Sequence, residues 1–141
     1  MKTQDCLQQF GLVPRNEDLP KIRDLLNQQA DLERAGRGGD REEDLALLCS
    51  VQLFSKGRDE DVLRIWDAKS SGFDLFSYVD IHLLCGGGLS STKDFLRKQS
   101  CKAAADALAH LEECEAAGDF VDFSPASRMN HYRAYFGVAL L

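Results

Sequence analysis

The sequence predicts an all-α protein that forms a single helical domain over residues 1–141. Apolar residues recur three and four positions apart along most of the chain, which is the spacing of one face of a helix. Short segments that contain glycine separate these stretches, and glycine commonly ends helices. With 44% apolar residues, a chain of this length can bury a core of its own. Because the connections are short, we expect about seven short helices arranged as antiparallel hairpins.

The N-terminal segment, residues 1–19, has no sustained apolar pattern, and we expect it to be partly irregular with one short turn at Asp5–Phe10. Pro20 then favours the start of a helix, because the N–H that proline lacks is not needed in a first turn. An apolar stripe follows as far as Gly36. This pattern predicts a helix over residues 20–35.

The second helix is expected to begin at Asp40, because Asp40 and Glu43 together match a capping box. Its apolar residues in the stretch 45–54 lie on more than one face, which predicts burial on two sides. Gly57 is expected to end this helix as its C-terminal cap.

A third helix is predicted over residues 59–69, where apolar residues recur at helical spacing before a Ser-Ser-Gly break. Asp74 is a candidate cap for a fourth helix, over residues 74–85, which is apolar almost all round and ends at Gly86–Gly88. A strand over residues 73–85 is the alternative, although the alternation of apolar and polar residues there is imperfect.

Three further helices complete the prediction. Ser91 and Asp94 match the cap pattern of a fifth helix. Residues 101–117 carry the clearest amphipathic stripe in the chain and predict a sixth. A Ser-Pro pair at positions 124–125 is a strong start signal for a seventh, over residues 125–136.

Two architectures remain open at this point. The predicted helix starts recur at intervals of roughly 30–40 residues, which is within the range of helical-hairpin repeats. The chain therefore suits either a minimal stack of the HEAT or TPR type or a compact orthogonal bundle.

The charge pattern indicates a class of partner. The formal net charge is −6, and residues 106–122 contain acidic side chains but no Lys or Arg. Such a face repels a polyanion, so we expect no nucleic-acid partner, whereas it would steer a basic protein toward itself. The predicted acidic face consists of Glu112, Glu113, Glu115, Asp119 and Asp122.

The C-terminal aromatic segment supplies secondary candidates for partner binding. Tyr and Arg are favoured at the energetic centres of interfaces, so we select Arg128, Tyr132 and Tyr135. The alternative is that the aromatic side of this helix packs on the core, as aromatic residues at helical spacing usually do.

The sequence also bears on compartment. No apolar run approaches the ~18 residues of a membrane span, and the N-terminus lacks the apolar centre of a signal peptide. The five cysteines are odd in number and widely spaced, which fits a reducing environment. We expect a cytoplasmic protein without a membrane partner.

Catalytic and cofactor signatures are weak. No nucleophile, base and orienting group can be named as a set, and Gly86–Gly88 is followed by residues in the wrong order for a phosphate loop. We therefore expect no enzyme, no cofactor and no metal. A zinc-supported helical domain is the alternative, because His and Cys recur at helical spacing in two pairs: His82 with Cys85, and His110 with Cys114.

Three stretches carry a resemblance: LLCSVQLFSKG at 47–57, RIWDAKSSGFD at 64–74 and IHLLCGGGL at 81–89. These stretches resemble small helical bacterial proteins of uncharacterised activity. In its size, acidity and helical pattern, the chain is also similar to immunity proteins, which neutralise cognate toxins. The resemblance implies a non-enzymatic inhibitor that binds a basic toxin domain, and it assigns no binding residues. We predict a protein–protein interaction module of this type. The alternatives are a structural or adaptor subunit that forms a homo-oligomer, and the zinc-supported domain.

Overall fold

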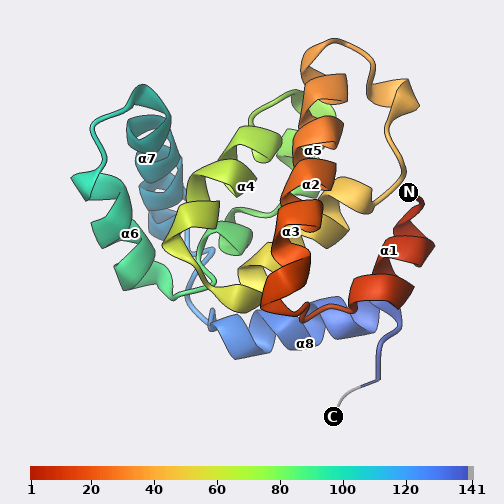
Figure 1. Ribbon diagram of the computed structural model, residues 1–141. Helices are drawn as coiled ribbons and strands as arrows, with labels where there is room; N and C mark the ends of the chain where they lie inside the picture. The colour runs from red at the N-terminus through yellow and green to blue at the C-terminus, as the bar shows by residue number, and fades with distance from the viewer. Residues whose placement is uncertain (140–141) are drawn as a thin grey trace.

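The computed structural model describes residues 1–139. This part of the chain contains eight α-helices and four short 3-10 helices, joined by short connections (Figure 1). In chain order they are α1 (Thr3–Phe10), η1 (Asn16–Asp18), α2 (Leu19–Arg34), η2 (Gly38–Asp40), α3 (Leu45–Lys56), η3 (Asp59–Asp61), α4 (Val62–Lys69), α5 (Phe73–Tyr78), η4 (Ile81–Leu84), α6 (Leu89–Lys98), α7 (Lys102–Ala116) and α8 (Pro125–Phe136). These described residues contain no strand. The all-α prediction is confirmed, and the strand alternative for residues 73–85 is wrong.

Helix α3 lies at the centre of the core. All of its residues from Leu45 to Phe54 are buried, as the apolar positions on more than one face predicted. It packs against α1, α2, α4 and α8, and α8 crosses it from the far end of the chain (Figure 1). In a solenoid each repeat contacts only its neighbours, so contacts of this range define a compact bundle instead.

The N-terminal segment is more ordered than predicted, because α1 is a complete helix rather than a single turn. Its Cys6 is fully buried, and the Cys6 thiol lies 3.7 Å from the side-chain oxygen of Gln52 in α3. The Gln52 amide donates a hydrogen bond of 2.7 Å to the carbonyl of Gly11. Gln52 has no exposure to water, so it needs such partners within the protein, and they fix the N-terminal segment to the core.

Two of the predicted capping boxes are wrong. Asp40 belongs to η2 and pairs with Arg37, so α3 begins five residues later with Asp44 at its N-cap. Ser91 lies inside the first turn of α6, which begins at Leu89 after a glycine. In both cases tertiary structure overrides the local cap pattern and moves the start of the helix. The Ser124 cap of α8 is confirmed, since its hydroxyl accepts a hydrogen bond from the amide of Ser127 at 3.1 Å.

The predicted helix over 74–85 is interrupted. Helix α5 ends at Tyr78 and is followed by η4. At this end of α5 the Lys69 ammonium forms hydrogen bonds to backbone carbonyls. Lys69 Nζ donates to the carbonyl of Phe76 at 2.6 Å and to that of Val79, and it lies 4.4 Å from the centre of the Phe76 ring. Burial lowers the pKa of Lys69. These bonds satisfy the end of α5 and permit the chain to turn.

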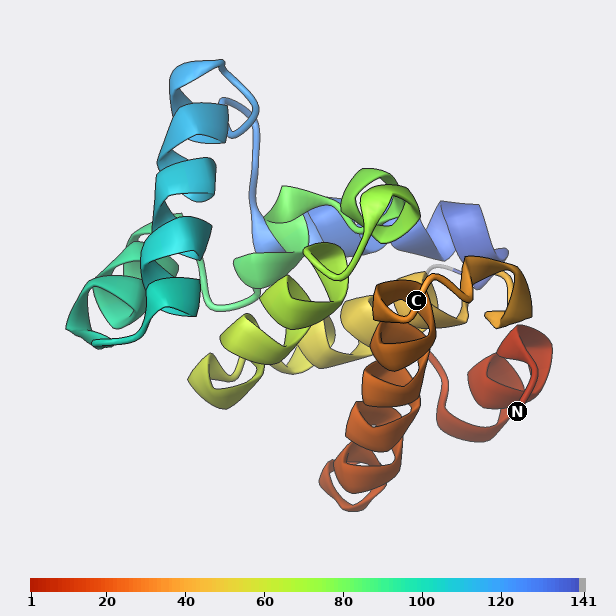
Figure 2. The same cartoon turned by 90° about the horizontal axis from the view of Figure 1, so that it is seen from above.

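Helices α6 and α7 form a hairpin, and α7 packs against α4. Figure 2 shows this hairpin at one end of the molecule, with α1 at the opposite end. The ammonium of Lys93 on α6 lies 2.7 Å from the Glu115 carboxylate on α7. The hairpin thereby places the C-terminal end of α7 and the connection to α8 at the molecular surface.

Candidate partner-binding surfaces

The five predicted acidic residues lie together at the C-terminal end of α7 and in the connection to α8. We call this set the acidic surface; it consists of Glu112, Glu113, Glu115, Asp119 and Asp122. All are exposed except Glu115, which is half-buried and paired with Lys93. The other four form no ion pair with any residue in 1–139. These four carboxylates are therefore free to accept ion pairs from a partner.

A surface hollow lies beside the acidic surface. Its volume is about 310 Å³, and Asp119 and Asp122 line it together with Val121, Arg128 and His131. The Val121 side chain is 80% exposed, which is unusual for a β-branched apolar residue. This place thus combines negative charge, an apolar contact point and a concave shape.

His82 holds the connection that carries these carboxylates. Its Nε2 lies 2.6 Å from the Asp119 carbonyl, which can only accept, so Nε2 is the protonated nitrogen. Its ring packs against Phe120 and Phe123, with ring centres 4.7 and 5.5 Å away. The other ring nitrogen, Nδ1, is buried without a hydrogen-bond partner among the described residues. His82 is therefore a positioning residue for the loop rather than an exposed contact.

The three secondary candidates for partner binding on α8 differ in how exposed they are. Tyr132 is 2% exposed and its hydroxyl donates a hydrogen bond to Asp80, so the prediction that it contacts a partner is wrong: the aromatic side of α8 packs on the core. Arg128 is half-buried, with its guanidinium 3.9 Å from the Asp80 carboxylate and 3.5 Å from the ring of His82. Tyr135 is 53% exposed and remains accessible.

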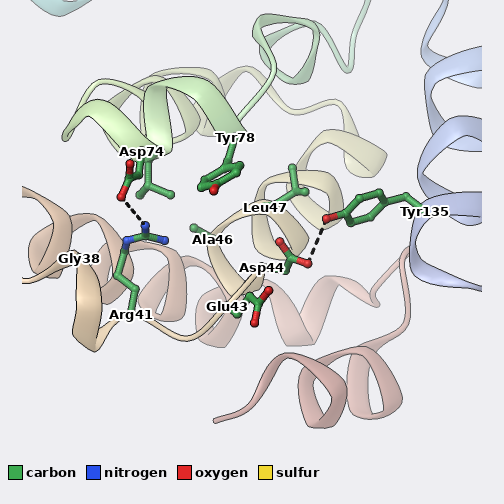
Figure 3. Close-up of a pocket in the computed structure, with 10 residues that line it drawn as sticks. Gly38, Arg41, Glu43, Asp44, Ala46, Leu47, Asp74, Tyr78 and Tyr135 are labelled. Atoms are coloured by element: carbon green, nitrogen blue, oxygen red, sulfur yellow. Dashed lines mark hydrogen bonds and ion pairs between the residues drawn. The ribbon is translucent and has the colours of Figure 1, made fainter.

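Tyr135 belongs to a second surface feature that the sequence did not indicate. A groove of about 420 Å³ runs between the connection that precedes α3, helix α5 and the end of α8 (Figure 3). We call it the α3–α5–α8 groove; it is lined by Gly38, Arg41, Glu43, Asp44, Ala46, Leu47, Asp74, Leu75, Tyr78 and Tyr135. Figure 3 shows Arg41 turned toward Asp74, and Tyr135 turned toward Asp44.

The charges in the groove are arranged by the fold. Arg41 is mostly buried, and its Nε donates to the Glu33 carboxylate at 3.1 Å, while Asp74 lies 3.8 Å from its other end. The Tyr135 hydroxyl donates to the Asp44 carboxylate at 3.0 Å. Desolvation, followed by this bond, raises the pKa of Tyr135. Glu43 is exposed and its carboxylate has no ion pair within residues 1–139.

Asp44 explains why sequence patterns missed this groove. An aspartate at an N-cap normally directs its side chain to the helix amides. Here Asp44 has φ 62°, in the left-handed region, and its side chain caps no amide of α3. The left-handed backbone turns the carboxylate toward Tyr135 instead. A Tyr on a helix 91 positions away leaves no local signal for such a pairing.

The four residues of the zinc alternative are not brought together. His82 lies in the 3-10 helix η4 and Cys85 directly follows it, and His82 faces the Asp119 carbonyl. His110 lies 3.7 Å from Cys114 and packs on Trp66. Burial raises the pKa of Cys85 to about 12, which disfavours the thiolate that zinc requires. Within residues 1–139, no three His, Cys, Asp or Glu side chains are grouped to hold a metal ion.

Comparisons of the chain with protein-family models, with curated proteins and with solved structures find no match. Across the described residues, every helix is too short or too polar to cross a membrane.

Proposed function

We propose that this chain is a non-enzymatic protein-binding module that takes a basic protein partner on its acidic surface. The observation that carries the proposal is the group of exposed carboxylates at Glu112, Glu113, Asp119 and Asp122, none of which forms an ion pair within residues 1–139. Glu115 extends this charge toward Lys93. A partner with Lys or Arg at its interface would supply the missing countercharges.

The surroundings of the carboxylates favour a protein over a small ion. The exposed Val121 and the adjacent hollow offer apolar contact area, which a folded partner can cover and a solvated ion cannot. His82 fixes the loop through the Asp119 carbonyl, so little ordering is needed on binding. In the immunity type of this function, which the resemblance implies, the partner is a basic toxin domain and binding inhibits it.

The test compares two variants with the same change in charge. The first carries Glu112→Gln, Glu113→Gln and Asp122→Asn. The matched control removes three exposed carboxylates elsewhere, by Asp5→Asn, Asp24→Asn and Asp59→Asn. Each immobilised protein is used to capture partners from a lysate of its own host at low and at high salt, and the bound proteins are identified and quantified.

We expect one basic protein to bind the unmodified chain and the control in near-stoichiometric amount. The acidic-surface variant should retain at least tenfold less, and high salt should weaken binding, because charge attraction between exposed groups is screened. Equal capture by both variants would contradict the proposal, as would a retained partner that is acidic.

A further inference from the structure

We propose that the α3–α5–α8 groove is a binding site for an arginine side chain of a polypeptide partner. The inference rests on the proposed function only in taking the partner to be basic. It assigns a different surface from the acidic surface, built from residues that precede α3 and from the helices α5 and α8.

The charge of the groove selects a cation. Its lining contains three carboxylates, from Glu43, Asp44 and Asp74, and one cation, Arg41. Arg41 is already held by the buried carboxylate of Glu33, at 3.1 Å. Glu43 forms no ion pair within residues 1–139, and Asp74 lies 3.8 Å from Arg41, so the groove lacks a full countercharge for its carboxylates. An anion would meet this excess of negative charge and is disfavoured.

The aromatic side chains select a guanidinium over an ammonium. Tyr78 is 61% exposed and Tyr135 is 53% exposed, although aromatic rings of this size are normally more buried. Both line the groove, with Tyr78 on α5 and Tyr135 on α8 (Figure 3). The flat, weakly hydrated guanidinium of arginine stacks on aromatic faces and forms paired bonds to a carboxylate, whereas the lysine ammonium is a strongly hydrated point charge.

The size of the groove and the orientation of Asp44 also suit an arginine side chain. A volume of about 420 Å³ is at the lower end of the range for small-molecule sites, and it accommodates one long side chain with its adjoining backbone. The Tyr135 hydroxyl uses one oxygen of Asp44, Oδ2, and leaves the other oxygen able to accept a bond from a guanidinium. Asp44 is thereby oriented before a ligand arrives, which reduces the cost of binding.

The experiment is an NMR titration of the ¹⁵N-labelled full chain with the blocked pentapeptide Gly-Gly-Arg-Gly-Gly. The same peptide with citrulline is the matched control, because citrulline keeps the shape of arginine and lacks its charge. A lysine peptide and inorganic phosphate are titrated in parallel. We expect saturable shifts from the arginine peptide at the amides of Asp44, Tyr78 and Tyr135, with binding at least fivefold weaker for lysine and no saturation for citrulline or phosphate.

Variants of the chain then test whether the carboxylates of the groove bind the arginine peptide. Glu43→Gln with Asp74→Asn should weaken binding of the arginine peptide about fivefold, in line with the loss of two partly exposed charge pairs. Asp24→Asn with Asp59→Asn removes the same charge elsewhere and should change it less than twofold. Retained dispersion in the spectra checks that each variant is folded.

The inference would be overturned by equal binding of the citrulline or lysine peptide, by saturable binding of phosphate in the groove, or by the absence of shifts at the groove. Shifts confined to residues 112–122 would also overturn it while leaving the proposed function intact, because they would place the cation on the acidic surface. Partner capture fails independently of this titration, so failures of the two proposals are distinguishable.

Discussion

The carboxylate of Glu33, on α2, accepts a hydrogen bond of 2.9 Å from the amide of Leu75 and so caps α5 from a position 42 residues earlier in the chain. The same carboxylate pairs with Arg41, and both side chains are nearly buried. Gly72 leaves the space that Glu33 occupies, since a Cβ at Gly72 would lie 2.5 Å from the Glu33 Cγ. One carboxylate thus joins α2, α5 and the wall of the groove.

We predict that Glu33→Ala lowers the free energy of unfolding by about 3 kcal/mol, because the Leu75 amide loses its partner and the mostly buried Arg41 guanidinium keeps only the longer contact with Asp74. Asp31→Ala is the matched control: Asp31 pairs with Arg34 at 2.9 Å, but both side chains are largely exposed. Its cost should stay below about 1 kcal/mol. Urea denaturation measures both values, and equal costs would show that Glu33 has no special role.

Gly86 permits the closest backbone approach in the glycine-rich segment before α6. A Cβ there would lie 2.2 Å from the carbonyl oxygen of Phe54 and 3.0 Å from the Cα of Gly57. Both are backbone atoms, so no side chain can move aside to make room. The segment that superficially resembles a phosphate loop is therefore explained by the packing of two chain turns against each other.

We predict that Gly86→Ala lowers the free energy of unfolding by about 2 kcal/mol through this overlap. Gly39→Ala makes the same chemical change where a Cβ would meet no atom within 4 Å, and neither glycine has a positive φ. The control should leave stability unchanged or raise it by less than about 1 kcal/mol. If thermal and urea denaturation show the two variants to be equally stable, the close approach at Gly86 is not tight.

The buried Tyr132 predicts how stability changes at high pH. Desolvation, reinforced by its hydrogen bond to Asp80, raises the pKa of Tyr132 well above its ordinary value of 10.0. The unfolded chain loses the phenol proton near pH 10, and the folded chain retains it. The contribution of Tyr132 to stability is therefore fully present below pH 10 and is lost as the pH rises above that value.

We predict that Tyr132→Phe reduces the free energy of unfolding by about 1–2 kcal/mol at pH 7, through the loss of the bond to Asp80. Above pH 10 the unmodified protein should lose up to about 1.4 kcal/mol per pH unit relative to this variant, so the difference between them shrinks. Denaturant unfolding between pH 8 and 11.5 measures both curves. Parallel curves above pH 10 would contradict the burial of the phenol. The control Tyr135→Phe, at a half-exposed position, should show a much smaller dependence.

Much of the fold could be predicted from local signals. The predicted ends of α3 before Gly57 and of α8 at residue 136 are confirmed, because the glycine after each helix adopts the left-handed conformation that ends a helix. The start of α8 at Ser124 is confirmed for a similarly local reason. Prediction failed at Asp40 and in the stretch 74–85, where contacts between helices decided the boundaries. Helix α3 begins after Asp44, whose carboxylate pairs with Tyr135 on α8, and the Lys69 ammonium bonds to a carbonyl at the end of α5.

The candidate sites show the same division. The acidic surface was predictable because its carboxylates are close in sequence and no cation intervenes. The sequence allowed the aromatic side of α8 to pack on the core, but it did not indicate that Tyr132 is the buried tyrosine, since its partner Asp80 is 52 residues away. The groove was not predictable either, because its walls come from three separated parts of the chain.

The sequence by itself determined the all-α class, the positions of most helices and the concentration of negative charge after α7, because helix periodicity, caps and charge runs act over a few residues. Only the tertiary structure decided that the helices form a compact bundle around α3, that Tyr132 is buried while Tyr135 is exposed, and that Asp44 faces a groove. These features depend on contacts between residues tens of positions apart, whose pairing is set by how the helices pack and by which buried polar groups must find a partner.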